Sequence, residues 1–264
     1  ASGKRVQTPA DDPIAATRAW IDTIPAAQRA KTDAYFEGGY WLQLWGALIG
    51  VASAWLLLAS GVSRRLRDAA ERITGREPLQ VVLYALGILA AFTLLSLPWS
   101  IYTEYFREHQ YGLSNQSFGQ WAAETLISSG LTIVVGAAVL LAIYATIRHA
   151  PRSWWLWGAG LMVAFAAFGS LVYPPFIAPL FNDYKPLANP QVREEVLSLA
   201  RAHGVPANEV YEFNASKQHS RISANVAGLG GTMRIALNDN LLNRSSAGEI
   251  RMVDLGEQAV QLRF

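Results

Sequence analysis

The sequence of 264 residues contains no cysteine, and only 16% of its residues are charged, whereas 52% are hydrophobic. The absence of cysteine excludes disulfide bonds, thiolate zinc sites and a cysteine nucleophile. Charge is scarce, because an ordinary soluble domain carries roughly 25% charged residues. The net charge is +2, and no basic run with interleaved aromatic residues is present, so we expect no nucleic-acid partner. The chain also lacks a P-loop, a dinucleotide-binding fingerprint and a G-x-S-x-G motif.

Charge is missing altogether from four long apolar stretches, Trp41–Ser60, Leu79–Thr103, Thr125–Ile147 and Ser153–Tyr173. Each reaches the ~20 residues that a helix needs to cross a bilayer. Backbone groups in lipid must hydrogen-bond to one another, so these stretches are predicted to be helices. We therefore predict a mainly α, multi-pass integral membrane protein with about four transmembrane helices. Pro98 is expected to kink or end the second helix, and the uncharged spans disfavour a transporter.

The spans divide the chain into three parts. Residues 1–40 form a polar or weakly amphipathic N-terminal segment, residues 41–173 the transmembrane region, and residues 174–264 a small, incomplete α+β region. With four spans, the loop 104–122 lies on the same side of the membrane as the C-terminal region. The arginine-rich loops 61–78 and 148–152 lie on the other side, which the positive-inside rule places in the cytoplasm.

The C-terminal region alternates helix and strand patterns. Asn189 and Pro190 are typical of a helix start. Three strands are predicted at Val210–Phe213, Arg221–Ala227 and Met233–Leu237, the last two joined by a glycine-rich turn at residues 228–231. Ser246–Glu249 has the form of a capping box, which predicts a final helix from Ala247 to about Leu262.

Three segments together resemble one known family. They are the loop His109–Gly119, the proline-rich exit from the last span at Tyr173–Asn182, and the run from Leu237 to Arg251. All three are similar to the type I CAAX prenyl endopeptidases, over roughly residues 35–251. The resemblance implies a membrane zinc metalloendopeptidase that cuts prenylated or other membrane-associated peptides. Eukaryotic members keep the catalytic region in the cytosol, contrary to the positive-inside argument, so the side of the membrane stays open.

The resemblance also implies a substrate-binding strand. In the family, an edge strand beside the active site hydrogen-bonds an extended peptide through main-chain groups, which is β-augmentation. Aligning on Gly228 assigns this role to Ser223, Ala224, Asn225 and Gly228. Ser223 stands at the family's Asn position, with Asn225 two residues on, so the contacting atom differs. The alternative is a plain hairpin that binds no ligand.

The family's zinc motif H-E-x-x-H does not occur in the 264 residues. The four histidines show no pair at the i, i+4 spacing, and the late acidic residues Glu249, Asp254 and Glu257 are expected to cap a helix or face solvent. No catalytic or metal-ligating residue is therefore assigned. Zinc is expected in the intact family member, but we expect none to bind this chain, and no peptide hydrolysis. Truncation, an altered reading frame, a boundary of the expressed segment or natural degeneration would each explain the missing motif. The alternative function is a non-enzymatic membrane protein that keeps the fold for peptide binding or assembly.

Overall fold

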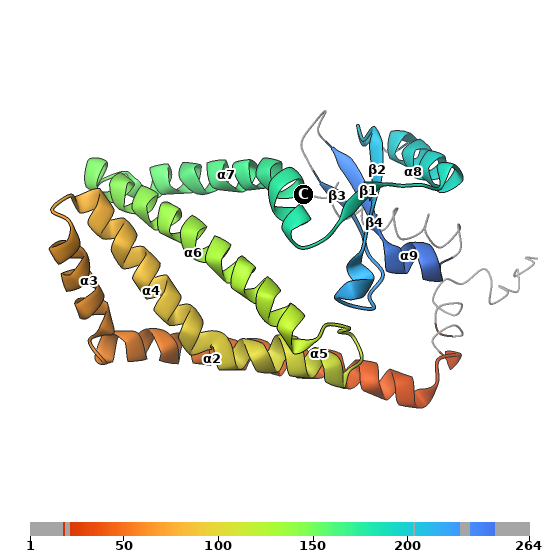
Figure 1. Cartoon of the computed structure of the whole chain (residues 1–264), viewed down its shortest axis with the longest axis horizontal. Helices are drawn as coiled ribbons and strands as arrows, with labels where there is room; N and C mark the ends of the chain where they lie inside the picture. The colour runs from red at the N-terminus through yellow and green to blue at the C-terminus, as the bar shows by residue number, and fades with distance from the viewer. Residues whose placement is uncertain (1–17, 19–21, 203, 228–232, 246–264) are drawn as a thin grey trace, which may run out of the picture. The chain divides into compact units, whose positions relative to one another are not determined.

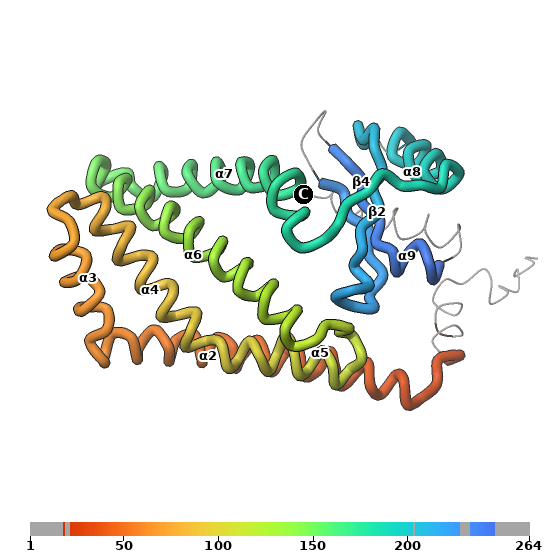
Figure 2. Tube along the Cα trace, viewed as in Figure 1, coloured from red at the N-terminus to blue at the C-terminus, as the bar shows by residue number. Residues whose placement is uncertain are grey.

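The computed structural model describes residues 18, 22–202, 204–227 and 233–245. The chain divides into two compact units at residues 52 and 53, and each unit is treated by itself. The first unit contains most of helix α2 (Ala26–Ala59), and the second contains all the following elements. Figures 1 and 2 show the long helices and the small sheet region, which follows them along the chain.

Four helical segments are long and apolar enough to cross a membrane, as predicted. They are Ala26–Ala59, Glu77–Gln110, Phe118–His149 and Trp154–Leu180. The second begins with α4 (Glu77–Ser100), the third is α6 (Phe118–His149), and the fourth begins with α7 (Trp154–Val172). Most of their side chains are exposed, which is the pattern of helices whose outer surface is covered by lipid.

Helix α3 (Val62–Ile73) occupies most of the predicted loop 61–78, which is a correction. Its apolar side packs on α4, where Gly87 leaves room for Leu66. A Cβ atom at Gly87 would lie 2.9 Å from the Leu66 Cδ2 atom. The arginine-rich composition suggested a loop, but the three apolar positions Leu66, Ala70 and Ile73 recur at helical spacing, and this amphipathic pattern is what the structure follows.

The helix of the second span continues past Pro98, and the predicted loop 104–122 begins later than expected. Pro98 lies inside α4, which continues into a π-helical turn at Ile101–Phe106 and then into α5 (Arg107–Gln110). A π-helical turn re-forms the hydrogen-bond ladder after the residue that cannot donate. Polar residues 104–110 are therefore helical, and the true loop covers only residues 111–117.

After α7 the chain passes through a π-helical turn at Tyr173–Ile177 and a 3-10 turn at Ala178–Leu180. We call Tyr173–Asn182 the exit segment. A four-stranded sheet of order β1-β2-β4-β3 follows. Its remaining elements are β1 (Tyr184–Pro186), α8 (Pro190–Ala202), β2 (Glu209–Phe213), a 3-10 turn (Ala215–Lys217), β3 (Ala224–Ala227), β4 (Arg234–Asn238) and α9 (Asp239–Arg244).

The sheet is mixed. β2 runs parallel to β4, whereas β1 pairs with β2 and β3 pairs with β4 in antiparallel fashion. One face, together with α8, builds the main apolar core of the region. Its fully buried side chains include Val210, Ile235, Leu237 and Leu241.

Several local predictions are confirmed in this region. The Asn189 Oδ1 atom accepts hydrogen bonds from the backbone N–H of Gln191 and Val192, so it caps α8. β2 and the antiparallel pairing of β3 with β4 are also present. β3 begins at Ala224 rather than at Arg221, and β1 and α9 were not predicted. The predicted turn 228–231 and final helix from Ala247 lie outside the described residues.

Candidate functional site

β3 lies at one edge of the described sheet, next to β4 alone. The backbone N–H of Asn238 donates to the Ser223 carbonyl oxygen at 3.0 Å, so these two residues form a hydrogen-bonded pair of the ladder. Hydrogen-bonded and non-hydrogen-bonded pairs alternate along an antiparallel ladder. The opposed pair Ala224 and Leu237 is therefore of the second kind, and the N–H and C=O of Ala224 point away from β4, toward the edge.

Three of the four predicted substrate-binding residues fall on or next to this edge strand. The Ala224 methyl group is buried in the core, so only its main chain can meet a ligand. Asn225 and Ser223 are partly exposed, and neither side chain makes a hydrogen bond to another described residue. Gly228 lies outside the described residues.

Two buried asparagines hold the chain in extended form just before β3. The Asn238 Nδ2 atom donates to the Arg221 carbonyl oxygen at 2.7 Å, and its Oδ1 atom caps α9 by accepting from Leu241 N–H at 2.9 Å. The Asn240 Nδ2 atom donates to the carbonyl oxygens of His219 at 2.7 Å and Arg221 at 3.2 Å. At and before Arg221, these side-chain amides take the place of backbone hydrogen bonds between two strands. This is why β3 starts three residues later than the sequence predicts.

The segment before β3 is also tied to the loop between α5 and α6. Ser114 and His219 form an isolated antiparallel bridge. Asn115 N–H donates to the Gln218 carbonyl oxygen at 2.9 Å, and Ser220 N–H donates to the Leu113 carbonyl oxygen at 3.1 Å. The family-like loop 109–119 and the segment before the predicted substrate strand therefore meet in the fold, although about 100 residues separate them in the sequence.

Two carboxylates reinforce this junction. Glu124 Oε2, on α6, accepts from Gln116 Nε2 at 2.7 Å and from Gln218 Nε2 at 2.8 Å. Glu108, on α5, is only 18% exposed and forms an ion pair with Arg221 at 2.6 Å. Hydrogen bonds to charged groups are stronger than hydrogen bonds between neutral groups. Glu108 and Glu124 therefore hold the segment before β3 against the ends of α5 and α6.

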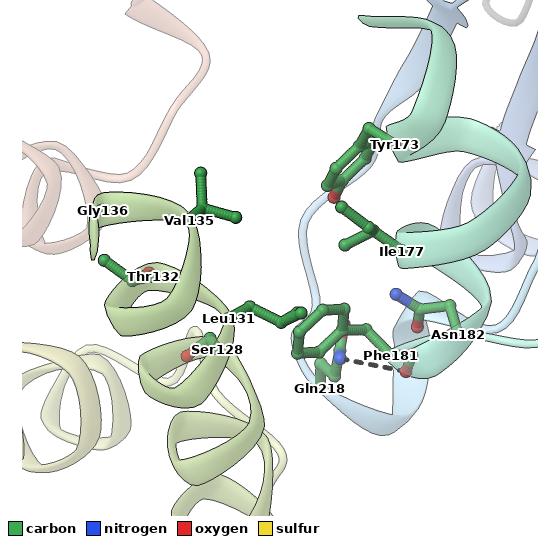
Figure 3. Close-up of a pocket in the computed structure, with 10 residues that line it drawn as sticks. All are labelled: Ser128, Leu131, Thr132, Val135, Gly136, Tyr173, Ile177, Phe181, Asn182 and Gln218. Carbon is green, nitrogen blue, oxygen red and sulfur yellow. Dashed lines mark hydrogen bonds between the residues drawn. The ribbon is translucent and has the colours of Figure 1, made fainter. Parts of the chain in front are cut away.

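An open groove of about 730 Å³ lies between α6 and the exit segment (Figure 3). Leu131 points from α6 toward Phe181 of the exit segment. Gln218 Nε2 lies 3.4 Å from the Phe181 carbonyl oxygen. The lining residues are Ser128, Leu131, Thr132, Val135, Gly136, Tyr173, Ile177, Phe181, Asn182 and Gln218. The walls are mainly apolar, with a few hydroxyl and amide groups among them.

Arg234 of β4 connects the sheet to the exit segment. Its guanidinium donates to the Pro174 carbonyl oxygen and lies over the rings of Tyr184 and Tyr211 at 5.3 and 5.4 Å. Burial raises the pKa of Tyr184 above 10.0, with a smaller opposing effect of Arg234. The neutral phenol and the cation–π contacts keep the groove wall and the sheet together.

Electrostatics keep His219 uncharged more readily than a free histidine. Burial is the largest cause and lowers its pKa below 6.5, and the nearby Arg221 cation acts in the same direction. His109 is occupied otherwise, because its Nδ1 lies 2.7 Å from the Tyr105 carbonyl oxygen and its Nε2 lies 2.8 Å from that of Gln116.

The described residues do not fit a zinc centre. Among them, no group of three His, Cys, Asp or Glu side chains is placed to hold a metal ion. His149 Nδ1 bonds to the Ala145 carbonyl oxygen. His203, Glu249, Asp254 and Glu257 lie outside the described residues. A catalytic zinc needs three protein ligands and an open position.

Several residues of the site were missed in the sequence. Asn238 ends β4 and begins an Asn-Asp-Asn run with Asn240, which is a helix-capping signal, and this could have revealed α9. Glu124 and Arg234 carry no local signal, since their partners are distant in the sequence. The strand assignment rested on resemblance, and the contacts that hold the strand in place emerge only from the fold.

Comparisons with known proteins show the family to which the chain belongs. Residues 15–183 match the family model described as CAAX prenyl protease N-terminal, five membrane helices, and residues 186–255 match the model of peptidase family M48. The chain belongs to the CAAX prenyl protease family. The described residues of this CAAX prenyl protease homologue contain four candidate membrane spans.

The relatives extend beyond the matched region. An uncharacterized metalloprotease of Bacillus subtilis is 32% identical over 78% of this chain and 49% of its own length. CAAX prenyl protease 1 of Saccharomyces cerevisiae is 28% identical over 64% of this chain and 38% of its own length. The crystal structure of S. mikatae Ste24p has the same fold, with a TM-score of 0.77 and 23% identity over 92% of this chain and 58% of that one. The chain thus spans about half, or less, of the length of these curated relatives.

Proposed function

We propose that these 264 residues form the membrane-embedded and substrate-holding part of a zinc metalloendopeptidase that acts on prenylated or other membrane-associated peptides. The observation that carries this proposal is the edge strand β3, fixed by Asn238 and Asn240 and tied to the ends of the membrane helices. Family membership supports a peptidase rather than a protein that only assembles with partners.

The substrate peptide adds to β3 as a further strand. The main-chain groups of Ala224 point to the edge, and the partly exposed side chains of Ser223 and Asn225 are available to neighbouring peptide groups. Main-chain bonding accepts many sequences, and specificity then comes from pockets for side chains or attached groups.

The apolar groove between α6 and the exit segment supports a lipid-modified substrate. Leu131, Val135, Ile177 and Phe181 supply apolar surface of the kind that an isoprenoid chain would cover. Burial of each CH₂ group contributes about 0.8 kcal/mol. The Gln218 side chain lines this groove six residues before β3, so one molecule can place its apolar group in the groove and its peptide near the strand.

The 264 residues are proposed to bind peptide without cutting it. They contain no H-E-x-x-H, and the described residues do not fit the zinc that the family implies. Zinc bound to an intact family member would supply an activated water, and we assign no catalytic step to any residue here. Zinc analysis and a cleavage assay on a prenylated peptide check this: stoichiometric zinc with hydrolysis by the 264-residue chain would contradict it.

Binding is tested separately, with the chain in detergent micelles and two peptides of the same sequence, prenylated and unprenylated. We expect the prenylated peptide to bind at least about tenfold more tightly, because a few buried CH₂ groups suffice for that factor. Equal affinity would remove the groove from the proposal.

The strand contact is tested with two prenylated peptides that carry N-methyl groups on alternate residues, in the two opposite registers. An added antiparallel or parallel strand uses the N–H groups of alternate residues to pair with its neighbour. One N-methylated peptide should therefore lose binding while the other retains it. Equal affinities of these two peptides would show that β3 does not hold the substrate.

A further inference from the structure

A second cleft, of about 400 Å³, lies between α3, α4 and α6 and is distinct from the groove described above. Arg64 and Arg67 line it from α3, Tyr84 from α4, and Tyr144 and Arg148 from α6. In Figure 1, α3 and the adjoining end of α6 lie at the end of the helices opposite to the sheet. The substrate-holding site therefore does not involve this cleft.

This end of the helices is strongly basic. Residues 61–77 and 148–152 contain seven arginines, three acidic residues and no lysine. The arginines are Arg64, Arg65, Arg67, Arg72, Arg76, Arg148 and Arg152, and the acidic residues are Asp68, Glu71 and Glu77. Arginine is the side chain best suited to phosphate, because its planar fork can donate two parallel hydrogen bonds.

One guanidinium that lines the cleft has no ion-pair partner among the described residues. Arg67 is paired with Asp68 at 3.3 Å and Glu71 at 3.6 Å, and Arg148 is paired with Glu77. Arg64 makes no ion pair or side-chain hydrogen bond with any described residue. The acidic residues of the cleft are thus occupied by two arginines, and the third cation remains available to an anion.

Three residues that carry hydroxyl groups, Ser63, Tyr84 and Tyr144, line the same cleft as Arg64. Ser63 Oγ and Tyr84 Oη lie 2.9 Å apart and share one hydrogen, which leaves the second hydroxyl hydrogen for another acceptor. Tyr144 adds a third hydroxyl to the lining. One unpaired guanidinium with two available hydroxyl donors matches the several acceptor oxygens of a phosphate group.

We propose that this cleft binds the phosphate headgroup of an anionic glycerophospholipid, with Arg64 as the principal cation. The cleft lies at the ends of apolar spans, where headgroups are found, and basic pockets between transmembrane helices bind such groups. Exposed apolar side chains next to it in the sequence, Leu79 and Ile147, offer surface for the acyl chains. Free phosphate shares the headgroup chemistry but would make no use of that surface.

The test measures the rise in thermal unfolding temperature of the full 264-residue chain, in a neutral detergent, as phosphatidylglycerol, phosphatidylcholine or inorganic phosphate is added. Phosphatidylglycerol should stabilise the protein in a saturable manner, and the other two should not at equal concentration. Arg64→Gln should weaken the apparent affinity about tenfold or more, since hydrogen bonds to charged groups are lost.

Arg65→Gln is the matched control, because it removes the same charge from the same helix at an exposed position outside the cleft. It should weaken the affinity by no more than about fivefold, the value of one general surface charge. Tyr84→Phe, which removes one hydroxyl and keeps the packing, should fall between them and serves if Arg64→Gln does not fold. Equal effects of the two arginine variants would overturn the proposal in favour of general surface charge. An equal response to inorganic phosphate, or no response to phosphatidylglycerol, would also overturn it.

Discussion

The membrane helices and the sheet region contain similar apolar side chains but use them in opposite ways. In α4, Leu94 is 69% exposed, whereas Leu237 in β4 is fully buried. The helices satisfy their backbone internally and leave most side chains to lipid. The sheet region buries a contiguous core of Leu, Val and Ile between its sheet and α8. Packing should therefore limit the stability of the sheet region, while hydrophobicity alone should suffice on the outer faces of the helices.

Matched leucine substitutions give the largest expected contrast. Leu237→Ala removes a fully buried side chain from the core and should lower the free energy of unfolding of the sheet region by about 2–5 kcal/mol. Leu94→Ala changes a side chain that contacts little protein and should cost less than about 1 kcal/mol. Near-UV circular dichroism, recorded during thermal or denaturant unfolding in detergent, measures the stability of both variants. Similar losses in the two variants would erase the distinction between the regions.

Two helix caps extend the comparison to polar groups within the sheet region. Asn238→Ala removes a buried cap of α9 and also the bond to the Arg221 carbonyl, so it should cost about 2–3 kcal/mol. Asn189→Ala removes the exposed cap of α8 and should cost about 1 kcal/mol. The denaturant concentration at the unfolding midpoint measures both costs, provided that the m-value is the same in all variants. A smaller cost for Asn238→Ala would mean that its two bonds do not fix the approach to β3.

The junction between the two regions is tested at Glu124. Glu124→Gln replaces two charge-assisted hydrogen bonds by neutral ones and should weaken the junction by about 1–2 kcal/mol. Hydrogen exchange at the Asn115 and Ser220 amides should then become about 5- to 30-fold faster. Glu195→Gln, at an exposed position of α8, is the control and should leave these amides unchanged. Unchanged exchange in Glu124→Gln would separate the junction from this carboxylate.

The smallest expected effect is a pH dependence at His219. Burial lowers the pKa of His219 below 6.5 in the folded state. Between that lowered pKa and pH 6.5, the unfolded state therefore binds more protons than the folded state. The stability contributed by the neutral ring is therefore complete above pH 6.5 and falls as the pH drops toward the folded-state pKa. His219→Gln should show a smaller loss of unfolding temperature between pH 7.5 and 5.5 than the original chain. An equal loss in His219→Gln and in the original chain would show that this ring does not contribute to the pH dependence.

Features with local signals were predictable. Uninterrupted apolar stretches predicted the spans, and Asn189 predicted the start of α8. Two strand-like segments on either side of residues 228–231 predicted the pairing of β3 with β4. Boundaries were less predictable, because residues 104–110, expected to lie in a loop, continue the helix through a π-helical turn and α5. The four substrate-binding assignments rest on family resemblance and stay predictions.

The sequence by itself determined where the chain crosses the membrane and which segments form helix or hairpin, because hydrophobicity and capping act over a few residues. Only the tertiary structure decided that β2 pairs in parallel with β4, that Glu124 and Glu108 hold the segment before β3, and that α6 faces the exit segment across a groove. These contacts join residues up to 113 positions apart. Their geometry follows from packing of the whole unit, which no local pattern encodes.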